Sequence, residues 1–93
     1  MPRMLRPKAT VLADAALVPA ANLKPPPKRF THQVVAAQPF HFSAAQADAA
    51  PDGHFAPGTR LLLLARDEGP MCTVQDAQGL CVVTALAGLR PLR

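Results

Sequence analysis

The stretch GTRLLLLARDEGPMCTVQDAQGLCVVT, residues 58–84, decides the fold. Short runs rich in Leu, Val and Thr alternate with turn residues, a pattern typical of β-strands joined by tight turns. We therefore predict that residues 58–65, 71–75 and 80–84 form a consecutive antiparallel meander. The connection DAQG, residues 76–79, has Asp first and Gly last, as type I turns prefer.

The register of the last two strands decides where the two cysteines lie. If Gln75 pairs with Leu80, one apolar face holds Cys72, Val74, Cys81 and Val83. A register shifted by one pair would set Cys72 opposite Cys81, where a disulfide becomes possible. The favoured interpretation is two reduced thiols that behave as small buried hydrophobic residues.

The flanking sequence predicts further short elements. FTHQVVAAQPFHF, residues 30–42, is rich in β-branched and aromatic residues and is expected to be the first strand, broken near Pro39. Residues 43–58 contain the turn signal Pro-Asp-Gly and are expected to be a long loop, with a short helix at 44–49 as an alternative. Residues 85–88 are typical of one helical turn closed by Gly, and residues 89–92 of a terminal strand.

This order of elements resembles the Src-homology-3-like small barrel over residues 30–93. The resemblance rests on GTRLLLL, MCTVQDAQGLCVV and ALAGLRPL. It implies a mainly β fold, a small five-stranded barrel preceded by an extended proline-rich N-terminal arm. Family members that bind proline-rich peptides use a Tyr-rich first strand and a Trp. This chain has neither Tyr nor Trp, and Met71 stands near the place of that Trp, so the peptide-binding function is not expected to carry over.

The arm is residues 1–29, and the barrel domain is residues 30–93. The arm holds six of the eleven prolines, which exclude a long helix or a continuous ladder strand. Residues 25–27 are a proline triplet that favours a stiff polyproline II spacer. Thr10 could N-cap a short helix over residues 11–18, which would need a surface to lie on. The arm is expected to contribute little to the barrel core.

The basic charge of the chain lies in the arm. Residues 1–29 carry six Lys and Arg against one acid, a net charge of +5, whereas residues 30–93 carry four Arg against five acids, a net charge of −1. A basic extension on a near-neutral body favours an anionic partner, either nucleic acid or an acidic protein surface. The alternative is a solvated tail.

No motif in the sequence favours catalysis or a cofactor. Ser43 lies two residues after His41 but lacks the context of a nucleophile. The spacing of the two Cys and three His residues does not fit a zinc site. The longest apolar run is residues 61–65, which is too short to span a membrane. We therefore expect a non-enzymatic protein with no metal, no organic cofactor, no small-molecule substrate and no membrane span.

The resulting hypothesis is a structural or assembly subunit, cytoplasmic or virion-associated, that docks through its arm on a larger protein complex such as a virion or a multi-subunit machine. The alternative is a nucleic-acid-associated module whose basic arm contacts phosphates. The predicted partner-binding residues are Arg3, Leu5, Arg6, Lys8, Leu12, Leu17, Lys24, Lys28 and Arg29.

Overall fold

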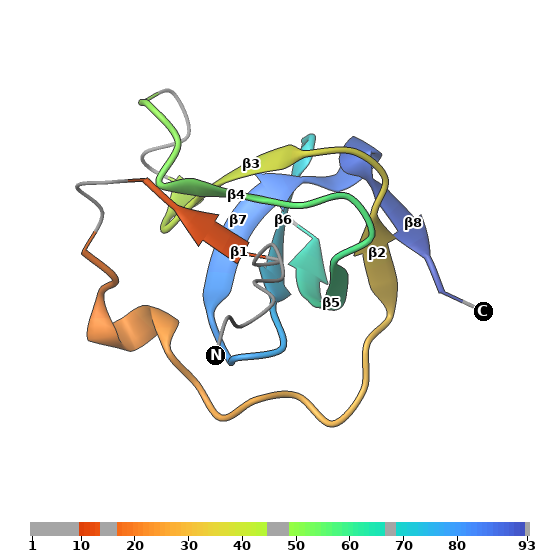
Figure 1. The fold of residues 1–93 in the computed structure, drawn as a ribbon, viewed down its shortest axis with the longest axis horizontal. Coiled ribbons are helices and arrows are strands. Elements are labelled where there is room, and N and C mark those ends of the chain that lie inside the picture. The colour runs from red at the N-terminus through yellow and green to blue at the C-terminus, as the bar shows by residue number, and fades with distance from the viewer. Residues whose placement is uncertain (1–9, 14–16, 45–48, 67–68, 93) are drawn as a thin grey trace, which may run out of the picture.

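The computed structural model describes residues 10–13, 17–44, 49–66 and 69–92. They form a mainly β molecule with one antiparallel sheet of eight strands (Figure 1), in the order β1-β4-β3-β7-β6-β5-β2-β8. The sheet is not closed and has β1 and β8 at its edges, so the expected five-stranded barrel is not confirmed. The strands are β1 Thr10–Leu12, β2 His32–Val34, β3 Gln38–His41, β4 Gly53–Phe55, β5 Arg60–Arg66, β6 Met71–Gln75, β7 Cys81–Ala85 and β8 Leu89–Pro91.

The predicted meander is confirmed, because β5, β6 and β7 pair antiparallel in chain order. The run of four leucines in β5 is not buried as a whole. Leu61 is fully buried, but the register shifts between Leu63 and Ala65, and Leu64 is exposed. A bulge of this kind bends the strand and turns one side chain outward, which the apolar run alone did not predict.

The turn between β6 and β7 is one residue longer than expected. The Asp76 carbonyl accepts a hydrogen bond from the Gly79 amide, which fits the predicted type I turn, but the Asp76 amide then donates to the Leu80 carbonyl. Gly79 has φ of 95°, so it is the left-handed residue that follows a type I turn in a three-residue hairpin loop. This extra residue makes Gln75 pair with Cys81 instead of Leu80.

The shifted register corrects the predicted apolar face. Pairing of Cys72 with Thr84 and of Val74 with Val82 makes these four residues the inward face of the β6–β7 pair, and all four are essentially fully buried. Cys81 therefore lies on the opposite face from Cys72, and the predicted face that joined both cysteines was wrong. No disulfide joins Cys72 and Cys81.

Residues 32–41 border the meander on both sides. The first strand of this segment, β2, pairs with β5 at one side of the meander, and its second strand, β3, pairs with β7 at the other side. The predicted break in this first strand exists, but it lies at residues 35–37 and not at Pro39, which is within β3. The bend curls the sheet around a common interior (Figure 1).

Three further predictions concern the segments outside the strands of the meander. The predicted long loop 43–58 contains β4, which pairs with β3. The alternative helix at 44–49 falls mostly outside the described residues. The helical turn is confirmed as the 3-10 helix η3 Leu86–Gly88, and the terminal strand as β8.

The core lies inside the curled sheet and is built by the body of the chain. Its buried members run from Val34 to Leu89, and Phe40 and Phe55 are both fully inaccessible. Their ring centroids are 4.6 Å apart, within the range of favourable aromatic pairs. From the arm, Val18 packs against this cluster. One aromatic pair and several small aliphatic side chains therefore make a thin core that benefits from additional cover.

The N-terminal arm is part of the sheet. Thr10–Leu12 forms β1 and pairs antiparallel with β4, so the predicted helix that begins after Thr10 is wrong. The reason is tertiary, since the edge of β4 offers backbone partners that an isolated two-turn helix lacks. The arm continues through the 3-10 helix η1 Ala20–Asn22, and the segment after η1 runs below the meander to β2 (Figure 1).

Candidate functional site

The second half of the arm is held on the turn between β6 and β7 by hydrogen bonds to backbone carbonyls. The Asn22 side-chain amide donates to the carbonyl oxygens of Phe42, at 2.8 Å, and of Cys81, at 2.6 Å. The Lys24 amide donates to the Gly79 carbonyl at 3.0 Å. In the other direction, the Gln75 side chain donates to the Pro25 carbonyl at 2.9 Å. The arm therefore docks on its own body at a defined register.

Asp76 links the first half of the arm to the same turn. It is 2% exposed, and its Oδ1 accepts the backbone amides of Gln78 and Leu80, each at 2.9 Å. Its Oδ2 accepts a hydrogen bond of 2.8 Å from the hydroxyl of Thr10, which lies 66 residues away in the sequence. Hydrogen bonds to an ionised carboxylate are stronger than neutral ones, and three of them compensate a buried charge.

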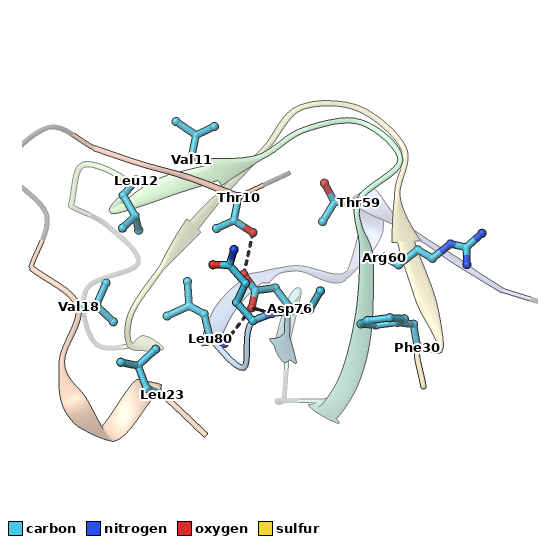
Figure 2. Close-up of a pocket in the computed structure, with 12 residues that line it drawn as sticks. Thr10, Val11, Leu12, Val18, Leu23, Phe30, Thr59, Arg60, Asp76 and Leu80 are labelled. Atoms are coloured by element: carbon cyan, nitrogen blue, oxygen red, sulfur yellow. Dashed lines mark hydrogen bonds between the residues drawn. The ribbon is translucent and has the colours of Figure 1, made fainter. Parts of the chain in front are cut away.

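A pocket of about 720 Å³ opens between the arm and this turn. Figure 2 shows Thr10 and Leu12 pointing into it from β1, with Val18 and Leu23 of the arm and Leu80 on the facing side. Phe30, Thr59 and Arg60 lie at the other end. The remaining lining residues are Val11, Asp76, Ala77 and Gln78.

Large apolar side chains are exposed around this pocket. Leu12 and Leu23 line it and are 40% and 53% exposed, and Leu17, which precedes the lining residue Val18 in the arm, is 88% exposed. Elsewhere in the described part of the chain, Val35 and Leu64 are comparably exposed. Scattered surface leucines are ordinary, but several of them beside an apolar pocket mark a surface that could bind another molecule.

Among the described residues, the exposed charges on the pocket lining or next to it in sequence are positive. Arg60 lines it, Lys24 follows the lining residue Leu23, and Lys28 and Arg29 precede the lining residue Phe30. All four side chains belong to exposed residues. Asp76 is the acid in the pocket wall, and its oxygens are occupied by the three hydrogen bonds described above.

Five of the nine predicted partner-binding residues lie in the described chain: Leu12, Leu17, Lys24, Lys28 and Arg29. Leu12 lines the pocket, and the other four are exposed on the arm. Arg3, Leu5, Arg6 and Lys8 lie outside the described residues.

Sequence reasoning missed the residues that the body contributes to the pocket. These are Phe30, Thr59, Arg60, Asp76, Ala77, Gln78 and Leu80. Asp76 had a visible signal as the first residue of a predicted turn. Nothing local in the sequence linked the turn to Thr10, because that contact exists only once the arm has docked.

Outside the pocket, His41 is a buried polar residue of the described chain, and Ser43 lies near it in sequence. Nε2 of His41 donates to the Ala49 carbonyl at 3.0 Å, while Ser43, two residues on, is exposed. Nδ1 of His41 is buried and has no hydrogen-bond partner. The described part of the chain also brings together no group of three metal-ligating His, Cys, Asp or Glu side chains.

The thiol of Cys81 lies beside the arm, on the outer face of β7. Its partial burial raises the pKa of the Cys81 thiol above the ordinary value; nearby Lys24 opposes this shift and Asp76 adds to it. Its Sγ also contacts the Gly79 carbonyl at 3.7 Å, where the protonated thiol can donate. Cys81 is therefore held mainly as a neutral thiol and not as an activated nucleophile.

Comparison with known proteins adds no relative on which a function could rest. A scan of family models and searches of curated proteins and of solved structures found no match to this chain. None of the helices in the described segments is long and apolar enough to cross a membrane.

Proposed function

We propose that this chain is a non-enzymatic docking subunit of a larger protein complex. It binds its partner through the surface made jointly by the N-terminal arm and the turn between β6 and β7, here called the docking surface. Its described apolar members are Leu12, Leu17, Val18, Leu23 and Leu80. We place the complex in the cytoplasm or in a virion, and the function needs no cofactor.

The observation that carries this proposal is the exposure of Leu12 and Leu23, which line an apolar pocket, and of Leu17, which precedes the lining residue Val18. Covering one large apolar side chain contributes about 1.5–3 kcal/mol before ordering costs are subtracted. The arm is already seated on the body by directed hydrogen bonds, so part of the ordering cost has been met within the chain. A partner would then meet a largely preformed surface.

The proposal extends to the fold. We propose that β2, β5, β6, β7 and β8 correspond to the five-stranded Src-homology-3-like unit, to which β1, β3 and β4 are added. The chain order of these five strands supports this correspondence.

The test compares two pairs of surface substitutions in tagged full-length protein expressed in the cells that encode it. One variant carries Leu12→Ser and Leu17→Ser on the docking surface, and its matched control carries Val35→Ser and Leu64→Ser at similarly exposed sites. Affinity capture with quantitative mass spectrometry is expected to recover the same partner proteins with the wild type and the control. We expect recovery with the docking-surface variant to fall roughly tenfold, the equivalent of one lost anchor side chain. Equal recovery with both variants would overturn the proposal.

The nucleic-acid alternative is tested in the same experiment. A variant with Lys24→Ala, Lys28→Ala and Arg29→Ala removes three exposed cations of the arm and leaves its leucines in place. The alternative predicts that this variant loses co-purifying DNA or RNA, and that the leucine substitutions leave partner recovery unchanged. If both results are found, phosphate binding replaces the docking proposal.

A further inference from the structure

Three polar side chains in the wall of the pocket, those of Thr10, Thr59 and Asp76, are hydrogen-bonded within the chain, and the other two, those of Arg60 and Gln78, belong to exposed residues, so the pocket interior suits an apolar group. The Thr10 hydroxyl donates to Asp76, and the Thr59 hydroxyl donates to the Ala56 carbonyl at 2.6 Å. Both oxygens of Asp76 are occupied. The rest of the wall is mainly the hydrocarbon of Val, Leu and Phe side chains. A polar ligand group would lose its hydrogen bonds to water in this pocket without new partners, which costs free energy. An apolar group would be stabilised by leaving water.

The charged residues that line the pocket, or stand next to lining residues in the sequence, determine which ligand charge is favoured around that apolar group. Arg60 and the arm residues Lys24, Lys28 and Arg29 are exposed. Within the described chain the acids are Asp52 and Asp76, and each is engaged by backbone amides. Complementary charges steer association and reject partners of the same sign. The ligand is therefore expected to be anionic outside its apolar anchor.

We infer that the pocket binds a bulky apolar side chain from an acidic segment of a partner protein. This inference rests on the docking function proposed above and names the chemistry of the partner. A protein segment is favoured over nucleic acid because the walls are mainly aliphatic. Phe30 is the aromatic ring that lines the pocket, whereas proteins that bind single strands stack successive bases on several rings.

The test measures the fluorescence anisotropy of labelled synthetic peptides with the full-length protein. The first peptide is Asp-Glu-Leu-Asp-Phe-Leu-Glu-Asp. The second has Ala in place of its apolar residues, and the third has Lys in place of its acids. The first peptide is expected to bind roughly tenfold more tightly than either of the others, and its affinity is expected to fall as salt is raised.

Matched variants place the binding at the pocket. Leu12→Asp and Arg60→Glu are each expected to weaken the first peptide roughly tenfold. The controls Leu64→Asp and Arg90→Glu make the same changes at exposed positions that do not line the pocket and are expected to bind as the wild type does. Circular dichroism of all four variants shows that they are folded before binding is compared.

Several results would overturn the inference. The Ala peptide could bind as tightly as the first peptide, or the Lys peptide could bind more tightly. The control variants could weaken binding as much as the pocket variants do. A single-stranded oligonucleotide could bind more tightly than the first peptide. If the peptide fails while partner capture still depends on Leu12 and Leu17, the docking function stands and the acidic partner is wrong. If partner recovery is also unchanged by the Leu12 and Leu17 substitutions, both proposals are wrong.

Discussion

At the scale of single residues, Gly79 shows how one position can set both a turn and a docking contact. Its φ of 95° suits glycine, and its carbonyl accepts the Lys24 amide of the arm. A Cβ at this position would collide with the Lys24 carbonyl oxygen. The residue therefore combines a conformational requirement with a requirement for space.

We expect Gly79→Ala to lower the free energy of unfolding by about 2–4 kcal/mol, since it adds a steric conflict to the left-handed strain. Gly58→Ala is the control, because Gly58 has φ of 85° but open space around its Cβ direction. That control is expected to cost about 1–2 kcal/mol, the strain alone. Urea denaturation monitored by circular dichroism measures both. An equal loss of unfolding free energy in the two variants would show that the Lys24 carbonyl does not limit the space at Gly79.

Cys81 provides a prediction about pH. Since burial raises the pKa of the Cys81 thiol, the thiolate fraction at a given pH is smaller than for a free thiol, and alkylation should be slower than that of glutathione. The rate should rise only as pH passes above the ordinary cysteine range. Removing the cation with Lys24→Ala should raise the pKa further and slow the reaction, whereas Lys28→Ala is the control. Iodoacetamide labelling followed by mass spectrometry gives these rates, and labelling of Cys81 faster than glutathione would contradict the assignment.

At the scale of elements, the hydrogen bond between Thr10 and Asp76 joins an edge strand to a distant turn. The same carboxylate organises the turn through two backbone amides. The β6–β7 turn is thus shaped from inside by its own Asp and held from outside by the arm.

A double-mutant cycle tests this link. Asp76→Ala is expected to cost about 2–4 kcal/mol, because it leaves buried amides without a partner, and Thr10→Val about 1 kcal/mol. The double mutant should lose less than the sum of the two, by about 1 kcal/mol. Thr73→Val on β6 is a control for the loss of a half-buried hydroxyl. Strict additivity in urea denaturation would mean that Thr10 and Asp76 do not interact in solution.

At the scale of the whole molecule, the arm behaves as an added layer on a body that has its own core. The buried cluster is made by residues of the body, while the arm adds β1, covers Leu80 and contributes Val18. A thin core of this size depends on such cover.

Residues 30–93 without the arm are therefore expected to keep β structure but to unfold at a lower urea concentration, with a loss of about 2–5 kcal/mol from exposed apolar surface and unpartnered polar groups. A synthetic peptide of residues 10–27 added in trans should restore part of this loss. An unchanged urea midpoint for the fragment would show that the arm adds nothing to stability, and the docking surface would then have to be reconsidered.

The sequence by itself determined the mainly β character, the meander of β5, β6 and β7, the helical turn at η3 and the terminal strand. These features are local, because alternating apolar residues and turn residues with few conformational choices set them within a short stretch of chain. The same local information predicted the type I turn at Asp76. It did not predict the extra left-handed residue at Gly79, and this single residue moved Cys81 to the opposite face from Cys72.

Tertiary structure alone decided the position of the arm, the strands β1 and β4, and the pocket. Thr10 and Val11 are residue types common in strands, but a three-residue segment does not fix its own conformation, so the available edge of β4 and the buried side chain of Asp76 determined it. The pocket lies between two parts of the chain, residues 10–30 and residues 59–80, and no spacing within either part encodes it. Leu12 was predicted from the sequence to bind a partner, and that prediction is untested; Arg60, Asp76 and Leu80 lie beside it in the pocket only through the long-range pairing that folds the chain.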